Sequence, residues 1–322
     1  ILFLCEMGLD PGIDHMSAKK LLNEINNSGG KVSSFISHCG GLVAPESDDN
    51  PWHYKISWNP RNVVMAGKNG ASYKQQNKLV QSGYEQLFDE VRTVPIPGYG
   101  QMAWYPNRDS LHYASLYRLE ESETFIRTTL RHPQFIDGWK KIIALHLTNE
   151  EKTFQSNNKS LNDFYIQHFA KNGIQLSDWI SENIETDFYQ QLKFIGLLDK
   201  NLMINKGLCS AADVLQFAWE KKLLLAPTDK DLVVMMHEIE FFKQEKKYKR
   251  TSTLIVKGEN NSETAMAKTV GLPLGICAKL ILNGTIKTKG LQIPVLEEIY
   301  EPVLMELEKN GIQFSEKEEE II

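Results

Sequence analysis

The stretch Gly8-Leu9-Asp10-Pro11-Gly12-Ile13-Asp14-His15 holds the residues whose types and spacing best suit chemistry. It follows an apolar run and precedes a segment with helical spacing, so we expect a strand-to-helix turn, where α/β sheets commonly hold ligands. Pro11 favours an extended conformation at Asp10, Gly12 permits a tight bend, and Asp14 is placed to cap the helix. Asp10 then has no structural role and can present its carboxylate to a ligand. The alternative is that Asp10 only shapes the turn.

Polar side chains alternate along a strand predicted over residues 124–131. Successive side chains of a strand point to opposite faces, so Arg127, Thr129 and Arg131 share one face, and the residues between them pack inward. An arginine on an exposed strand face is usually only solvated. The alternation alone therefore does not assign a binding role to Arg131.

Two further candidates lie at the ends of predicted elements. Cys39 ends a strand expected over residues 31–39, and in the alternative interpretation it is a small buried hydrophobe. Asn59 precedes Pro60, a pair typical of a helix start, so its side chain either caps that helix or serves a ligand. The four cysteines are far apart and show no zinc-ligand spacing, so we expect neither a disulfide framework nor a structural metal.

The composition is that of a soluble globular protein. Its 322 residues, of which 42% are hydrophobic, suffice for one large or two ordinary domains. A net charge of -5 gives no basic footprint for nucleic acid, and the basic segment 243–250 is predicted to be a solvated turn between two strands. No apolar run approaches the roughly 18 residues of a membrane helix and no signal peptide is recognisable, so we expect a cytoplasmic protein. The chain opens inside an apolar strand without an initiating Met, which suggests a piece of a longer protein.

The elements that must position these residues follow the order strands, helices, strands. Strands are expected at 31–39, 91–96, 101–105 and 124–131, a helical block at 133–220, and a hairpin at 231–242 and 250–257. Beyond it we expect a helix over 262–283 that is interrupted at Gly271-Leu272-Pro273, a helix over 294–309, and a frayed, solvated acidic tail over 315–320. This order predicts an α+β fold, in which a mixed β-sheet domain carries a helical insertion.

Six short motifs occur between the start of the chain and residue 302: Gly8 to His15, Cys39-Gly40-Gly41 leading to Ala44-Pro45-Glu46-Ser47, Tyr105 to Ser110, Thr129-Leu130-Arg131, Met266 to Gly271, and Ile293-Pro294 followed by Ile299-Tyr300-Glu301-Pro302. Each is weak alone. Together, and in this order, they resemble the saccharopine dehydrogenases of the glutamate-forming type, also called saccharopine reductases. The resemblance covers nearly the whole chain.

The resemblance implies a Rossmann-like domain that binds NADP or NAD, a substrate domain, and a return of the chain to the nucleotide domain. Residues 1–30 would be the last Rossmann strand and its connecting helix. Residues 31–258 would form the substrate-binding and dimerisation domain, with a helical insertion at about 133–225, and residues 259–322 would be helices returning to the nucleotide-binding domain. Because the sequence has no GxGxxG between a strand and a helix, most of the Rossmann-like domain is expected to be absent. A homodimer is also implied.

The implied chemistry is oxidation of saccharopine, a small-molecule substrate of lysine metabolism, by hydride transfer to NADP or NAD, which gives glutamate and aminoadipate semialdehyde. By resemblance, the substrate-binding residues are Asp10, Arg108, Thr129, Leu130 and Arg131, with Leu130 acting through its backbone. Saccharopine has three carboxylates, and arginine supplies the planar, permanently charged donors that carboxylates require.

The resemblance also places Leu9, Asp10, Pro11 and Asn59 near the nicotinamide end of the cofactor. Proton transfer needs a group with a pKa near neutrality, for which Asp10 is the first candidate and Cys39 the second. The sequence leaves open whether the cofactor is NADP or NAD, and whether the reaction serves synthesis or breakdown.

Two other functions stay open. One is a related dehydrogenase for another imine, such as a carboxynorspermidine-type substrate. That substrate is more cationic and would require acidic residues where this chain has Arg108 and Arg131. The other is a non-catalytic module that binds an amino acid or mediates dimerisation, which the absence of the glycine-rich turn supports.

Overall fold

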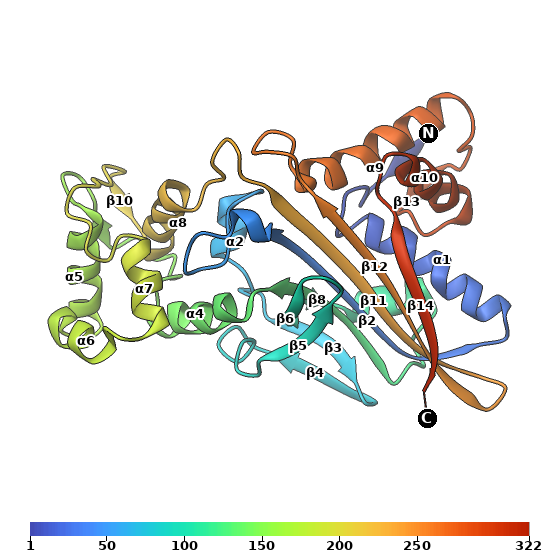
Figure 1. Ribbon diagram of the computed structural model, residues 1–322, viewed down its shortest axis with the longest axis horizontal. Coiled ribbons are helices and arrows are strands. Elements are labelled where there is room, and N and C mark those ends of the chain that lie inside the picture. The colour runs from blue at the N-terminus through green and yellow to red at the C-terminus, as the bar shows by residue number, and fades with distance from the viewer. Residues whose placement is uncertain (322) are drawn as a thin grey trace.

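The computed structural model describes residues 1–321, and a mixed β-sheet of ten strands forms its centre (Figure 1). The strands of this sheet are β2 (Lys31–Val43), β3 (Ala71–Gln75), β4 (Lys78–Ser82), β5 (Arg92–Ile96), β6 (Gly100–Pro106), β7 (Arg108–Asp109), β8 (Thr124–Arg131), β11 (Asp231–Lys243), β12 (Lys246–Lys257) and β14 (Phe314–Ile321). The main path runs β14-β12-β11-β2-β8-β3-β4, while β6 pairs with β8 and with β5, and β7 with β3. The β2–β8 and β3–β7 pairs are parallel and the others antiparallel, which confirms the expected mixed sheet.

The remaining elements are helices and short strands outside this sheet. They are β1 (Leu2–Leu4), α1 (Ile13–Asn27), the 3-10 turn η1 (Pro45–Ser47), α2 (Pro60–Val64), α3 (Leu111–Tyr117), α4 (Pro133–Ala144), β9 (Phe154–Gln155), α5 (Leu161–Lys171), α6 (Leu176–Asn183), α7 (Asp187–Phe194), β10 (Leu208–Cys209), α8 (Ala211–Lys222), α9 (Ala265–Leu282), β13 (Gly290–Gln292) and α10 (Glu297–Lys309). β1 pairs in parallel with β13. Helices α1, α9 and α10 cover one face of the long strands (Figure 1).

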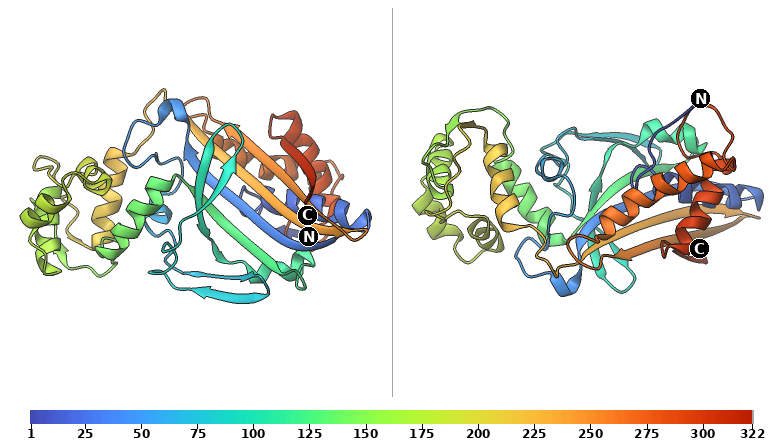
Figure 2. Two further views of the ribbon diagram at one scale, coloured as in Figure 1. Left: turned by 60° about the horizontal axis from the view of Figure 1, so that its bottom comes forward. Right: turned by 90° about the horizontal axis from the view of Figure 1, so that it is seen from above.

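The helical insertion gathers α4 to α8 at one end of the molecule, away from α9 and α10 (Figures 1 and 2). Its core is rich in aromatic side chains, and Trp52, Trp139 and Trp219 are fully buried in it. The rings of Trp139 and Trp219 meet edge to face with their centroids 5.3 Å apart. The expected helical insertion is therefore present, and its core is continuous with side chains of β3, β6 and β8 on the sheet.

Strand β2 continues beyond Cys39 to Val43, whereas the sequence predicted its end at Cys39. The glycines at this point do not end the strand. A Cβ at Gly40 would lie 2.7 Å from the Leu130 Cβ and 2.8 Å from the Leu130 carbonyl oxygen. Glycine is required here because β2 and β8 approach so closely, which is a recognised role of glycine inside strands.

Helix α9 is continuous, so the predicted interruption at Gly271-Leu272-Pro273 is wrong. Its N-terminus is held from outside by Asp231, the first residue of β11, whose carboxylate accepts the N–H groups of Ala265 at 2.6 Å and Met266 at 2.9 Å. Among residues 1–321, α9 is the one helix long and apolar enough to cross a membrane, by length and composition alone. The expectation that no such run exists was therefore wrong, and α9 packs its buried side against β11 and β12.

The acidic tail is also ordered, and its prediction as a frayed segment is wrong. It forms β14, which pairs antiparallel with β12 from Leu254 to Lys247. The basic segment 243–250, predicted as a turn, lies mostly in β12, and the turn itself is Gln244-Glu245. Arg250 lies 2.6 Å from Glu318, and Lys246 lies 3.0 Å from Glu320. Opposite charges on neighbouring strands thus account for an edge strand that is acidic along its length.

Candidate active site

A cleft of about 750 Å³ opens over the face of β8 that carries Arg127, Thr129 and Arg131. The other walls are the turn before α1, the segment 58–69 around α2, the segment 105–113 from β6 to α3, and Glu150. This volume is in the usual range for small-molecule sites. Five of the residues expected from the sequence line it: Asp10, Pro11, Arg108, Thr129 and Arg131.

The turn before α1 presents Asp10 to the cleft. The Gly8 N–H donates to the Pro11 carbonyl at 3.1 Å, and Gly12 has φ of 150°. A Cβ at Gly12 would lie 2.0 Å from the Gly8 carbonyl oxygen, so only glycine fits. Asp14 is not the helix cap that the sequence predicted, because Gly12 occupies that position and Asp14 lies in the first turn.

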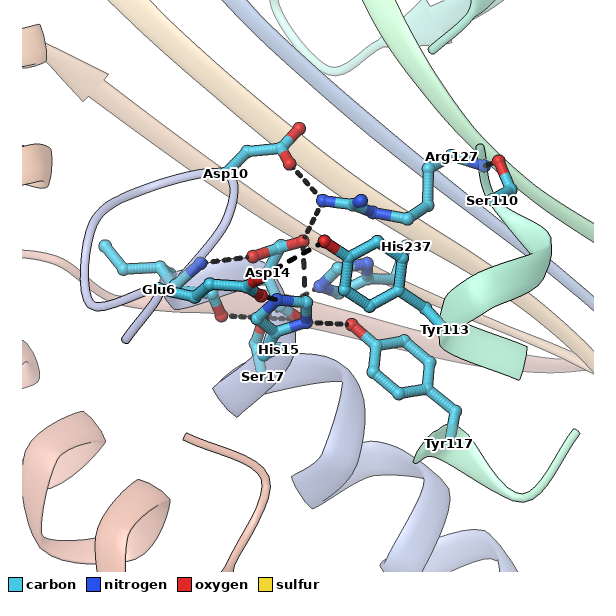
Figure 3. A network of polar contacts seen from close by, with 12 residues as sticks. Glu6, Asp10, Asp14, His15, Ser17, Ser110, Tyr113, Tyr117, Arg127 and His237 are labelled. Atoms are coloured by element: carbon cyan, nitrogen blue, oxygen red, sulfur yellow. Dashed lines mark hydrogen bonds and ion pairs between the residues drawn. The ribbon is translucent and has the colours of Figure 1, made fainter. Parts of the chain in front are cut away.

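Two carboxylates share the guanidinium of Arg127 (Figure 3). Nη2 of Arg127 forms an ion pair with the Asp10 carboxylate, and the same nitrogen lies 2.8 Å from Oδ2 of Asp14. Asp14 also accepts the Gly12 N–H at 2.6 Å. Asp10 therefore has an ionic partner within the protein, unlike the unengaged carboxylate that the sequence indicated.

The two carboxylates differ in their proton affinity. Burial raises the pKa of Asp10, and Arg127 opposes this effect without cancelling it. Burial acts in the same direction on Asp14, but the charges of His15 and Arg127 and the Gly12 N–H outweigh it, so the pKa of Asp14 lies below its ordinary value. Asp10 is consequently the member of the pair that takes up a proton more readily.

His15 lies behind this pair and is fully buried. Its Nε2 is 2.7 Å from Glu6, and its Nδ1 is 2.6 Å from the Tyr117 hydroxyl (Figure 3). His38 lies on the opposite face of the sheet, 2.7 Å from the Thr128 hydroxyl. Both ring nitrogens of His15 are thus engaged by protein groups, which supports a structural role.

Arg131 is buried and has no carboxylate partner among residues 1–321. Its guanidinium lies over the rings of Tyr54 and Phe135 and donates to the Leu130 carbonyl at 2.8 Å. Its Nε has no hydrogen-bond partner in this part of the chain. A buried, unpaired guanidinium at a cleft is costly unless an anion completes it.

The other predicted residues have different surroundings. Leu130 is fully buried against β2, and Leu9 is buried in the core under α9 and α10. Asn59 is exposed and caps α2, its side-chain oxygen accepting the Asn62 N–H at 3.3 Å. Cys39 is buried, and burial followed by the charges of Asp10 and Asp14 raises the pKa of its thiol well above the ordinary value. Within residues 1–321, no group of three or more His, Cys, Asp or Glu side chains is arranged to hold a metal ion.

Comparison with known proteins places these residues in a family. The family model of the saccharopine dehydrogenase C-terminal domain matches residues 8–312. The chain belongs to the saccharopine dehydrogenase family. The saccharopine dehydrogenase [NADP(+), L-glutamate-forming] of Saccharomyces cerevisiae is 34% identical over 97% of this chain and 72% of its own length. The alpha-aminoadipic semialdehyde synthase of Arabidopsis thaliana is 34% identical over 99% of this chain and 32% of its own length.

A solved structure in the saccharopine dehydrogenase family has the same fold. The apo saccharopine dehydrogenase (L-Glu forming) from Saccharomyces cerevisiae superposes with a TM-score of 0.89, at 33% identity over 99% of this chain and 74% of that one. The resemblance read from the six motifs is thereby confirmed. The expected class, an NAD(P)-dependent oxidoreductase acting on a CH–NH donor, is confirmed through the saccharopine dehydrogenases among the relatives.

Sequence reasoning missed two basic residues of this cleft. Arg127 was placed on the correct face of its strand, but its pairing with residues more than 100 positions earlier has no local signal. Lys68 lines the cleft from the segment after α2 and has no carboxylate partner among the described residues. Nothing in the spacing around Lys68 could have indicated this position.

Proposed function

We propose that this chain binds saccharopine in the cleft and takes part in its oxidation to glutamate and aminoadipate semialdehyde, with NADP or NAD as the hydride acceptor. The secondary amine of the substrate loses a proton, and hydride leaves the carbon beside the bridging nitrogen. Water then adds to the resulting imine, and the C–N bond breaks. The relatives named saccharopine dehydrogenase and the family membership support this reaction.

The observation that carries the proposal is the set of cleft cations without a carboxylate partner. Lys68, Arg108 and Arg131 line the cleft, and no ion pair within residues 1–321 involves them. Arg127, the other arginine that lines the cleft, forms ion pairs with Asp10 and Asp14. Three unpaired cations match the three carboxylates of saccharopine. The same set disfavours a polyamine-like substrate, whose positive charge they would repel.

We assign proton transfer to Asp10 rather than Cys39. Asp10 lines the cleft, and burial raises its pKa toward the range in which a carboxylate exchanges protons near neutrality. The Cys39 thiol is not among the residues that line the cleft, and its raised pKa keeps it protonated. In this proposal Asp10 accepts the proton of the substrate amine.

The residues beside Asp10 fit the nicotinamide end of a cofactor. Asp10 and Pro11 present a tight turn to the cleft. Asn59 is not part of the cleft wall but lies between Trp58 and Asn62, which are, and its side-chain oxygen caps α2. Leu9 is buried, so it would act through its backbone. When bound, NADP or NAD would supply the acceptor for the hydride.

The proposed organisation has two parts. Residues 1–30 and the helices from residue 259 would belong to a nucleotide-binding domain, and 31–258 to the substrate domain, with the insertion at about 133–225. Strand β14 pairs with β12, so the returning segment would end before residue 314. Exposed apolar side chains of β1, β13 and α9, such as Phe3, Leu291 and Leu274, support a packing surface on this side. A homodimer and a cytoplasmic location stay predictions.

Calorimetric titration with saccharopine tests the proposal. We expect Arg131→Ala to weaken binding at least about 30-fold, because losing one partner of a desolvated ion pair costs about 2 to 5 kcal/mol. Arg108 is exposed at the rim, so Arg108→Ala should have a smaller effect in the same direction. Lys193→Ala, which removes one exposed positive charge on α7, is the control. Equal affinity in the Arg131 variant and the control would refute the site.

A further inference from the structure

The ion pairs of Arg127 divide its surroundings into a cleft side and a helix side (Figure 3). On the cleft side lies Asp10, which lines the cleft. On the helix side lies Asp14, whose side chain is only 2% exposed and which is not part of the cleft wall. One guanidinium therefore connects a carboxylate that a ligand can reach with one that it cannot.

Asp14 is held in place independently of Asp10. Its Oδ1 accepts the Gly12 N–H at 2.6 Å, and it lies in the first turn of α1, where a negative charge is favoured by the helix dipole. His15 lies beside it, with Nδ1 3.9 Å from Oδ2. These contacts favour the ionised form of Asp14, consistent with its lowered pKa.

Arg127 is equally fixed. It lies near the middle of β8, and its backbone N–H donates to Oγ of Ser110, a fully buried residue, at 2.9 Å. The ring of Tyr113 lies 4.3 Å from the guanidinium carbon (Figure 3). These contacts hold Arg127 where its guanidinium reaches both carboxylates.

We propose that Asp14 and Arg127 are positioning residues: they form a fixed ion pair that orients the Asp10 carboxylate toward the cleft and leaves Asp10 as the group of the cluster that exchanges a proton. This inference rests on the proposed function, in which Asp10 accepts the proton of the substrate amine. Neither positioning residue has to touch the substrate.

The physical reason is charge balance. Arg127 alone beside Asp10 would favour the ionised carboxylate and make it a weaker base. Burial is the main cause of the raised pKa of Asp10, and the negative charge of Asp14 adds to it by offsetting part of the effect of Arg127. Seven other ionisable groups lie around this cluster on neighbouring elements: His15 on α1, Arg108 on β7, Tyr113 and Tyr117 on α3, Cys39 on β2, His237 on β11, and Glu6 before the turn.

The test follows the titration of Asp10 itself by NMR of the protein labelled with carboxyl-¹³C aspartate. The Asp10 signal is assigned by its loss in Asp10→Asn. We expect Asp14→Asn to lower the apparent pKa of Asp10 by about 1 unit or more, because Arg127 then acts on Asp10 alone. We expect Arg127→Met to raise it by a similar amount. Shifts of opposite sign cannot arise from a general loosening of the fold.

Two further variants complete the experiment. Arg127→Lys keeps the charge and should leave Asp10 titrating within a few tenths of a unit of the parent protein. Asp137→Asn, which removes an exposed carboxylate on α4, should leave it unchanged.

Shifts of the same sign in Asp14→Asn and Arg127→Met, or no shift in either, would overturn the proposal. Should Arg127→Met fail to fold, Asp14→Asn and Arg127→Lys decide the matter by themselves. The proposed function is judged separately by saccharopine binding in the parent protein. Failure of the positioning role and failure of the substrate assignment therefore give different results.

Discussion

His237 on β11 is a fully buried ionisable residue outside the cleft. Its Nε2 lies 2.7 Å from the Ser17 hydroxyl, and its ring stacks between Phe35 and Phe314. Its Nδ1 has no hydrogen-bond partner among the described residues. Burial lowers the pKa of His237 to about 4. These surroundings indicate a structural histidine of the sheet, and because the buried ring is neutral, the stability of the sheet depends on pH.

We predict that this protein loses stability as the pH falls from about 6.5 to about 4, and that His237→Gln weakens this dependence. The unfolded chain protonates His237 near 6.5 and the folded chain only near 4, so the unfolded state binds more protons in this window. The full difference corresponds to about 3 kcal/mol. Urea unfolding at several pH values measures it, with His112→Gln on the exposed side of α3 as control. An unchanged slope in the His237 variant would contradict the prediction.

Among the elements, β14 is the strand whose attachment to the sheet depends most on ion pairs. Arg250 is the centre of its pairing, since it contacts Glu318 at 2.6 Å and Glu24 of α1 at 3.0 Å. Lys249 and Lys247 pair instead with Glu238 and Glu240 on β11. The basic strand β12 thus lies between two acidic neighbours. Single exposed pairs contribute little, but β14 has few buried side chains to hold it otherwise.

We therefore predict that Glu318→Lys loosens β14 without unfolding the sheet. The new lysine repels Arg250, and a cost of about 1 kcal/mol would raise amide exchange in β14 roughly five-fold. Glu306→Lys on α10 makes the same change of net charge elsewhere and should leave β14 protected. Hydrogen exchange with mass spectrometry resolves the two segments. Equal exchange in both variants would show that backbone pairing alone holds β14.

The same elements show what local sequence can predict. The face of β8 that carries Arg127 and Arg131 follows from simple alternation, and the structure bears it out. The continuity of α9 cannot be predicted locally, because packing against the sheet outweighs the tendency of Pro273 to interrupt a helix. Strand β14 and the Asp10–Arg127 pair could not be predicted from the sequence for a different reason. Their partners lie 60 to 74 residues away for β14 and 117 residues away for Asp10, and nothing in a single sequence records such pairings.

At the scale of the whole molecule, two of its cavities are candidate binding sites. One is the cleft over β8, and the other, of about 220 Å³, lies in the helical insertion between His146 and Asn172. The second is lined by His168, whose ring is already bonded to the Leu145 carbonyl at 2.8 Å. The insertion reaches the cleft through Glu150, which pairs with Arg61 at 2.9 Å.

We predict that saccharopine slows amide exchange in separate segments that meet at the cleft, namely 6–11, 58–69, 105–113 and 127–131. A bound ligand protects the backbone that contacts it, so segments far apart in the chain should respond together. Peptides of α5 and α6 serve as the internal control and should not change. Protection centred on residues 146–172 would move the site into the insertion.

The close approach of Gly40 to Leu130 has a consequence for how recognition can change. Arg131 donates to the Leu130 carbonyl, and its Nη1 also lies 3.5 Å from the Gly41 carbonyl oxygen. Any side chain at position 40 would clash with Leu130. The Leu130 carbonyl, which binds the Arg131 guanidinium, would then have to move. Ligand preference in this protein can thus be altered from a residue that lies behind the cleft, while every residue on the cleft surface keeps its identity.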